Sequence, residues 1–325
     1  MKPLHAWTSH RFPVPLPPGH RFPVGKHAPL LETLVGERVL APEHVHPSEP
    51  APVAWLELAH DADYIARVLD GALDDAEVRR VGLPWSPELA LRARAAAMGT
   101  VLAAFAALRH GVAGNLAGGS HHAFRDRAGA YCLFNDAVLA ITVLRAHGAG
   151  ARRPFVADLD VHQGDGTAAM CADDPSIFTF SLHAASNYPL HKQQSTLDVA
   201  LPDDTGDDAY LHALDRHLPA ALDAHAPDLV IYQAGVDPLA EDRLGHLALT
   251  HAGLAARDAR VFAWCEARSV PVVFTMGGGY AEPLSASIAA HADVWRAARH
   301  ARDRGADVHD ERPFDHAVDV PPVTR

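Results

Sequence analysis

The segment "FVADLDVHQGDGTA", residues 155–168, begins as an apolar strand and continues into four side chains that can bind protons or metal ions. They are Asp158, Asp160, His162 and Asp165. Residues two apart in a strand share a face, so the first three could point the same way. With Asp237 from another apolar segment, Asp160 and His162 would form a site of two carboxylates and one imidazole. Three protein ligands with an open position are typical of catalytic zinc, and the oxygen-rich set leaves Fe²⁺ and Co²⁺ open.

Two buried aspartates without a cation would repel each other, and each would cost several kcal/mol in lost solvation. A divalent metal ion removes this conflict. The alternative is that each carboxylate only caps a neighbouring helix, which is a reasonable explanation for one aspartate but a poor one for the whole group. The sequence therefore predicts a metal centre.

Further reactive side chains follow other apolar segments. Residues 176–183 end in Ser181, Leu182 and His183, and "MGGGY" ends in Tyr280. "GGSHHAF" places His121 and His122 after two glycines. A tyrosine hydroxyl can donate to a developing oxyanion. Each imidazole could donate one N–H to a carboxylate, with Asp158 and Asp165 as candidates, which would fix its tautomer.

These segments alternate with predicted helices, which indicates an α/β fold. The predicted strands cover 153–161, 176–183, 228–235 and 270–279, and the predicted helices cover 87–110, 135–148, 207–225 and 251–268. Continuous apolar strands separated by helices favour a mostly parallel sheet covered on both faces. Ligands bind such sheets at the carboxyl ends of the strands, where the reactive side chains fall. We expect one domain over 1–325, an extended segment over 1–50 with a short helix near 26–35, and a surface tail over 301–325.

The composition excludes several classes of protein. The 325 residues are 48% hydrophobic with a formal net charge of −12, which indicates a large core and no nucleic-acid partner. Cys132, Cys171 and Cys265 show no CxxC spacing, which is typical of a reducing compartment. We find no apolar signal segment and no apolar run of about 20 residues, so we expect a cytoplasmic protein without a membrane partner. The oligomeric state is not predicted.

The motifs together resemble the histone deacetylase family, which has the arginase/deacetylase fold. The matching segments, in order, are "GGSHHAF", "AYCLFNDA", "DLDVHQGDGTA", "FTFSLH", "YQAGVDPLAEDRLG" and "MGGGY", and the resemblance covers about 20–300. It implies zinc on Asp160, His162 and Asp237, the dyads His121–Asp158 and His122–Asp165, and Tyr280 as the carbonyl polariser. It also implies a substrate pocket at Tyr131, Tyr188 and Leu244. A structural potassium ion near Asp158, Asp160, His162, Ser181 and Leu182 is implied as well.

The resemblance implies hydrolysis of an acetyl or longer acyl amide. The amine could belong to a lysine of a peptide or protein, or to a small N-acyl amine such as an acetylpolyamine. Two differences concern the substrate. Both pocket walls are tyrosines where phenylalanine is common, and no aspartate lies about 40 residues before the histidine pair, where Arg79, Arg80 and Gly82 stand.

Two other classes of protein fit these residues less well. Binuclear manganese ureohydrolases share the fold but need further carboxylates, where this chain has Leu239 and Gly164. A non-catalytic protein that binds acyl-lysine or metal would be expected to lose Tyr280 or the histidine pair, and both are present.

Overall fold

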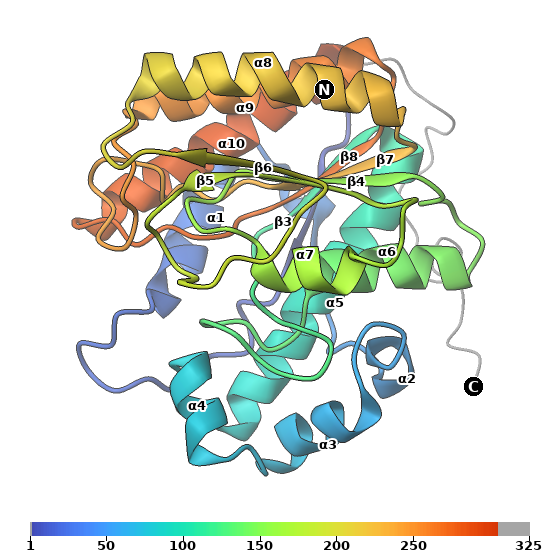
Figure 1. The fold of residues 1–325 in the computed structure, drawn as a ribbon, viewed down its shortest axis with the longest axis vertical. Helices are drawn as coiled ribbons and strands as arrows, with labels where there is room; N and C mark the ends of the chain where they lie inside the picture. Colours follow the sequence, from blue (N-terminus) through green and yellow to red (C-terminus); the bar gives the residue numbers. More distant parts are fainter. Residues whose placement is uncertain (1, 305–325) are drawn as a thin grey trace.

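The computed structural model describes residues 2–304, which are built around one eight-stranded sheet (Figure 1). The strand order is β2-β1-β3-β8-β7-β4-β5-β6, and every pairing between these strands is parallel. The strands are β1 His5–Thr8, β2 Val45–Pro47, β3 Val112–Asn115, β4 Pro154–Asp158, β5 Phe178–Ala184, β6 Leu197–Leu201, β7 Leu229–Gln233 and β8 Val272–Thr275. The predicted α/β architecture is confirmed, with a sheet that is parallel throughout.

The helices surround this sheet. They are α1 His27–Gly36, α2 Val53–Leu56, α3 Ala62–Asp70, α4 Asp75–Val81, α5 Pro87–His110, α6 Asp136–Ala146, α7 Asp165–Cys171, α8 Asp207–His225, α9 His251–Ala267 and α10 Leu284–Arg304, with two 3₁₀ turns, η1 Val24–Lys26 and η2 Pro42–His44. The long predicted helices form where expected because their ends are marked. Ser86 accepts a hydrogen bond from the Leu89 N–H at 3.1 Å, Pro87 takes the first position of α5, and Gly111 ends it with φ of 82°.

Two predictions about the chain ends are wrong. Residues 1–50 are not simply extended with one helix, because β1 and β2 lie there and pair with each other and with β3. The proposed tail over 301–325 begins too early, because α10 continues to Arg304 with Ala301 and Arg302 buried. Residues 305–325 lie outside the described residues.

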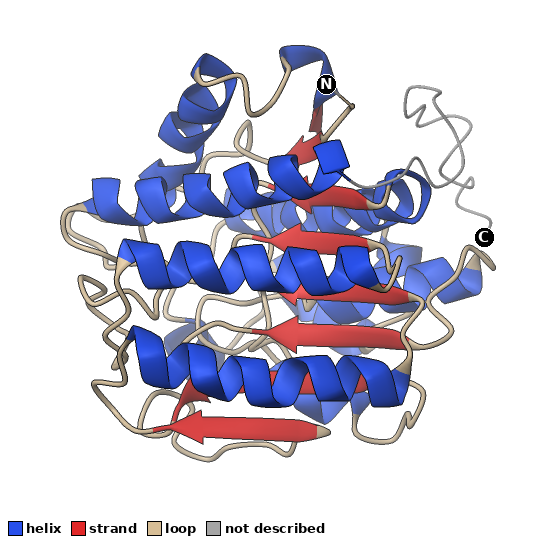
Figure 2. Ribbon diagram, turned by 90° about the horizontal axis from the view of Figure 1, so that it is seen from above, coloured by secondary structure: helices blue, strands red, loops and turns tan. Residues whose placement is uncertain are grey.

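Each face of the sheet packs against its own set of helices. α8, α9 and α10 lie across one face, as Figure 2 shows, and α5 and α6 lie on the other. Side chains along β4 alternate between the two apolar clusters, with Phe155 and Ala157 in one and Val156 in the other. Burial on both faces explains why the strand segments read as continuous apolar runs.

Helix α5 is long and apolar enough to span a membrane by length and composition alone. However, 67% of its most apolar 18-residue window is buried inside the protein. It packs in the same apolar cluster as α6 and β3. Its apolar character is therefore explained by its position in the core.

Candidate active site

The carboxyl ends of four neighbouring strands meet at one site. β3, β8, β7 and β4 lie side by side in the sheet and run in the same direction. The segments that leave their carboxyl ends carry the histidine pair, Tyr280, Asp237 and Asp160 respectively. The strand order therefore brings together residues that are up to about 160 positions apart in the sequence.

Asp160, His162 and Asp237 converge as the sequence predicts. One ligand atom of each lies within 4.8 Å of those of the other two. His162 Nδ1 is 3.0 Å from Asp160 Oδ1 and 3.1 Å from Asp237 Oδ2. All three residues are buried, and Asp237 is fully inaccessible. Among residues 2–304, no other group of three acidic, histidine or cysteine side chains meets the same distance limit.

Backbone groups hold the two carboxylates in place. Asp160 Oδ2 accepts a hydrogen bond from the Gly278 N–H at 2.8 Å, and Asp237 Oδ1 accepts one from the Val161 N–H at 2.9 Å. A Cβ atom on Gly278 would lie 1.8 Å from Asp237 Oδ2, and one on Gly235 would lie 2.4 Å from Asp160 Oδ2. Gly278 of "MGGGY" and Gly235 of "YQAGVD" are therefore needed because the backbone at both positions touches the carboxylates.

The charges of these three residues fit a divalent cation. Burial and the charge of Asp160 raise the pKa of Asp237 to about 7. Burial acts to lower the pKa of His162, but its hydrogen bonds to Asp160 and Asp237 raise it to about 10. Two buried carboxylates thus compete for one positive partner, and a metal ion would satisfy all three donors.

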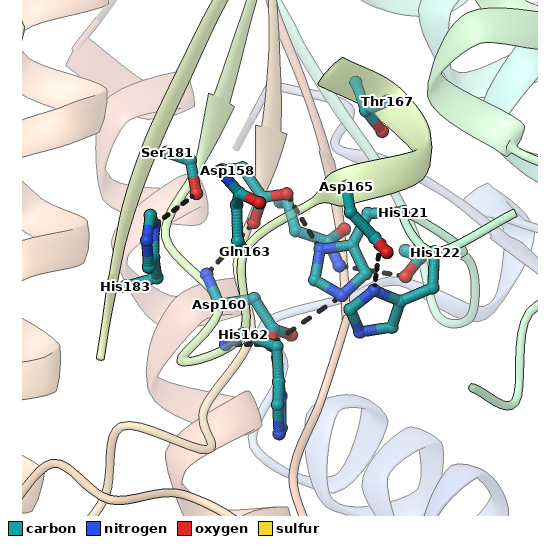
Figure 3. Close-up of polar contacts among 12 residues, drawn as sticks. His121, His122, Asp158, Asp160, His162, Gln163, Asp165, Thr167, Ser181 and His183 are labelled. Atoms are coloured by element: carbon teal, nitrogen blue, oxygen red, sulfur yellow. Dashed lines mark hydrogen bonds and ion pairs between the residues drawn. The ribbon is translucent and has the colours of Figure 1, made fainter. Parts of the chain in front are cut away.

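The two predicted histidine–aspartate pairs are present (Figure 3). His121 Nδ1 lies 2.8 Å from Asp158 Oδ2, and His122 Nδ1 lies 2.6 Å from Asp165 Oδ1. The two imidazole centroids are 4.0 Å apart. Since a carboxylate is only an acceptor, each Nδ1 carries the hydrogen and each Nε2 is left to exchange a proton.

The two imidazoles have opposite electrostatic environments. Burial acts to lower the pKa of His121, but the charges of Asp158 and Asp160 raise it to about 9. Its Nε2 is 3.8 Å from Asp160 Oδ1, so it faces two carboxylates. Burial and the neighbouring charge of His121 lower the pKa of His122 to about 4, although Asp165 acts in the other direction.

Tyr280 is positioned as a hydrogen-bond donor. Burial and the charges of Asp237 and Asp160 raise its pKa well above the ordinary value, so the phenol stays protonated. Its hydroxyl makes no hydrogen bond to any other residue within 2–304, and the side chain lines the site pocket. Lys26, which sequence reasoning missed, donates from Nζ to the Gly277 carbonyl at 3.2 Å and lies 5.8 Å from the Tyr280 ring centroid. Burial lowers the pKa of Lys26 to about 8.

A pocket of about 510 Å³ connects this chemistry to solvent. It is lined by the predicted wall residues Tyr131, Tyr188 and Leu244, together with His121, His122, Asp160, His162 and Tyr280. The Tyr188 ring meets the His122 ring edge-on, with centroids 4.8 Å apart. The Tyr131 and Tyr280 centroids are 5.9 Å apart. The aromatic walls therefore lie directly beside the reactive groups.

Three side chains that position the site, the buried Asp136 and His60 and the half-buried Asp242, were not singled out from the sequence. Asp242 accepts the Tyr280 N–H at 2.6 Å, and Asp136 accepts the Ser120 N–H at 2.6 Å just before the histidine pair. His60 donates to the Phe124 carbonyl and accepts the Asn135 N–H. Asp136 and Asp242 lie in segments that carry the family resemblance, "AYCLFNDA" and "DRLG", which was the available signal. For His60 we find no such signal.

The residues implied for potassium are partly brought together. Asp158 and Ser181 are directly paired in the β4–β5 register. Leu182, the residue after Ser181, and His162, four residues after Asp158, are both buried. The Ser181 hydroxyl lies 2.9 Å from His183 Nδ1, as drawn in Figure 3.

The two positions where a second catalytic metal would need carboxylates do not offer them. Leu239 lies in the apolar core, and a Cβ on Gly164 would meet Asp158 Oδ2 at 2.1 Å.

An open parallel sheet with this centre at its carboxyl edge has the arginase/deacetylase fold. Residues 20–295 match the family model of the histone deacetylase domain. The chain belongs to the histone deacetylase family.

Relatives of known sequence agree with this assignment. An uncharacterized protein of Picosynechococcus sp. is 44% identical over 285 residues, which cover 88% of this chain and 95% of that protein. Histone deacetylase 2 of Arabidopsis thaliana is 35% identical over 198 residues, 59% of this chain and 50% of that one. The acetoin utilization protein AcuC of Bacillus subtilis is 31% identical over 217 residues, 60% of this chain and 56% of that one. The chain thus aligns with only about half the length of the last two proteins.

Solved structures show the same fold. A histone deacetylase homologue complexed with SAHA superposes with a TM-score of 0.80 at 25% identity, covering 92% of this chain and 84% of that one. A homologue from Aquifex aeolicus gives a TM-score of 0.79 at 22% identity, covering 98% of this chain and 93% of that one.

Proposed function

We propose that this protein is a metal-dependent deacylase that removes an acetyl or longer acyl group from a lysine side chain or a similar amine. One observation carries the proposal. A metal-type donor set, two histidine–aspartate pairs and a protonated tyrosine without a hydrogen-bond partner among residues 2–304 lie in or against one pocket. That combination can supply the activated water, the proton transfers and the oxyanion donor that hydrolysis of an unactivated amide needs.

Asp160, His162 and Asp237 would hold the metal ion, with Zn²⁺ as our first choice and Fe²⁺ or Co²⁺ as alternatives. When bound, such an ion supplies Lewis acidity and lowers the pKa of a water molecule. The aspartates keep their position through the backbone N–H groups of Gly278 and Val161.

The two imidazoles would move the protons through their Nε2 atoms. His122 would accept the proton of the attacking water, because it faces a single carboxylate and can remain neutral. His121 faces Asp158 and Asp160, which favour its charged form, and would donate a proton to the departing amine. Tyr280 would donate to the carbonyl oxygen as negative charge develops there.

Tyr131, Tyr188 and Leu244 would enclose the linear side chain that carries the acyl group. We also infer, from the family resemblance, a structural potassium ion near Asp158 and Ser181. Their direct pairing in the sheet supports this inference.

A direct test uses the purified protein, loaded with Zn²⁺, and a fluorogenic acetyl-lysine amide. We expect hydrolysis that stops when a chelator or a hydroxamate is added and returns when the metal is restored. If longer and shorter acyl amides all remain intact while the metal is bound stoichiometrically, the protein is a binding protein and the proposal is wrong.

A further inference from the structure

Two arginines stand at the mouth of the pocket. Arg79 and Arg80 occupy the last turn of α4, both are exposed, and both line the pocket that contains the reactive groups. The end of α4 is fixed to the pocket wall, because the Tyr131 N–H donates to the Val81 carbonyl at 2.7 Å. The arginines are therefore attached to the wall and not to a separate part of the surface.

The charges of Arg80 and of a third arginine, Arg21, act on the two aromatic walls. Burial raises the pKa of Tyr188, and the charge of Arg80 acts against that rise. Burial also raises the pKa of Tyr131, and there the charge of Arg21 acts in the opposite direction. Arg21 lies between His20, whose Nε2 is 3.0 Å from the Gly82 carbonyl, and Phe22, which contacts the Tyr131 ring.

The guanidinium groups of Arg21, Arg79 and Arg80 form no hydrogen bond or ion pair with any other residue of the described range 2–304. This is unexpected in a chain with 40 acidic side chains and only 28 lysines and arginines. Of the acidic residues at the start of α4, Asp74 and Glu77 form the capping box and Glu77 also pairs with Arg67, while Asp75 forms no ion pair with either arginine. The dipole of α4 favours cations in its last turn, but it does not require that they line a pocket.

A second polar cluster near the pocket contains His246, Ser186 and Asp203. His246 lines the pocket, and the Ser186 hydroxyl donates its one hydrogen to the Asp203 carboxylate, with its oxygen 2.6 and 2.8 Å from the two carboxylate oxygens and 2.7 Å from His246 Nδ1. Asp203 does not line the pocket, and the only carboxylate among the lining residues of the described range is that of buried Asp160. The pocket lining at α4 therefore carries the two arginine charges without a carboxylate among the neighbouring lining residues.

We propose that Arg79 and Arg80 select substrates that carry a carboxylate next to the acylated side chain. The inference rests on the proposed deacylase function and names its substrate class. When the acylated side chain of a lysine lies between Tyr131 and Tyr188, its backbone atoms emerge at the mouth. A free α-carboxylate, or the carboxylates of flanking acidic residues, would then meet the two guanidinium groups. Acetylpolyamines, which carry further ammonium groups, would be repelled.

The test compares two substrates that differ in one charge. They are Nε-acetyl-lysine with a blocked α-amine, once as the free carboxylate and once as the carboxamide. We expect kcat/KM to be about fivefold higher for the carboxylate, as two exposed ion pairs would give. The ratio should fall towards one as ionic strength rises. Peptides with acetyl-lysine between two glutamates or between two arginines show whether the carboxylate comes from a free amino acid or from a polypeptide.

The double variant Arg79→Gln, Arg80→Gln should reduce the ratio to about one. The matched control is Arg216→Gln. Arg216 is also exposed, but it lies on α8, which is far from α4 in Figure 1. This variant should leave the ratio unchanged. A wild-type ratio of one or less, or a ratio that survives in the double variant, would overturn the inference.

A binding measurement tests this inference independently of the proposed deacylase function. Two linear hydroxamates, one ending in a carboxylate and one in a carboxamide, can be titrated into the Zn²⁺-loaded protein by calorimetry. Tighter binding of the carboxylate that is lost in the double variant supports the role of the arginines even if no amide is hydrolysed. Equal binding of both compounds overturns it even if hydrolysis is efficient.

Discussion

The backbone N–H of Tyr280 donates to Oδ2 of Asp242 at 2.6 Å, across 38 positions of sequence. Oδ1 of the same carboxylate accepts the N–H groups of Leu244 and Gly245 at 2.9 and 3.0 Å. One half-buried carboxylate thus fixes the backbone both of the tyrosine that would polarise the substrate and of the leucine that lines the pocket. Asparagine could accept from only one of these two sides, because its amide nitrogen is a donor.

Asp242→Asn should therefore reduce kcat by about tenfold to a hundredfold, the range expected when a catalytic group is displaced by about 1 Å. Bound Zn²⁺ should stay stoichiometric, because Asp242 is not among the proposed metal ligands. Combining it with Tyr280→Phe should cost little more than Tyr280→Phe alone, since both changes act on the same group. Fully additive losses in kcat would show that Asp242 acts independently of Tyr280. Asp70→Asn, an exposed aspartate, is the control.

Tyr280→Phe removes the hydroxyl without changing the ring that Lys26 contacts. Loss of one donor to an oxyanion typically costs about 10²–10³ in kcat. Metal content and hydroxamate binding should stay close to wild type. Tyr131→Phe removes a hydroxyl from the same pocket and should affect KM more than kcat. If the two variants behaved alike, Tyr280 would have no special role.

The reactive residues of the site could be predicted from the sequence, but the residues that hold them in place could not. Asp160, His162, Asp237 and Tyr280 follow apolar strands, and a parallel sheet aligns strand ends, so their meeting follows from local pattern and topology. His60, Asp136 and Asp242 act through hydrogen bonds to backbone groups 16 to 75 positions away. No local periodicity encodes such contacts.

The strands also differ in how well the sequence predicts them. β4 and β7 are buried on both faces and read as apolar runs. β1 and β2 are short, contain His5 and His46, and lie near one edge of the sheet, where their pairing depends on tertiary contacts. Such strands carry too little periodicity to be recognised.

Replacing Asp237, a proposed metal ligand, should have opposite effects on stability with and without the metal. In the apo protein Asp160 and Asp237 are buried together, so Asp237→Asn removes a repulsion and should raise Tm. In wild type, added Zn²⁺ should raise Tm in proportion to the logarithm of its concentration, because it binds the folded state. In the variant this shift should be strongly reduced. An equal Zn²⁺ shift in both proteins would contradict the assignment of the ligand, and thermal unfolding measures it without any substrate.

His60 should make stability depend on pH. It is 1% exposed, donates from Nδ1 to the Phe124 carbonyl at 2.9 Å, and accepts the Asn135 N–H at Nε2 at 3.0 Å. A proton on Nε2 would face that N–H. Burial lowers the pKa of His60 from 6.5 to about 4, so between these values the unfolded chain binds more protons than the folded one. Its contribution is therefore fully present above pH 6.5 and is lost as pH falls towards 4.

The measurement is the free energy of unfolding in urea at several pH values between 4 and 7. Other buried histidines add to the pH dependence, so the informative quantity is the difference between wild type and His60→Gln. In this window the variant should show a slope that is smaller by up to about 1.4 kcal/mol per pH unit, which corresponds to one proton. His212→Gln, an exposed histidine of α8, should leave the slope unchanged. If His60→Gln kept the wild-type slope while lowering stability equally at every pH, His60 would support the loop after the histidine pair without acting as a proton-sensitive group.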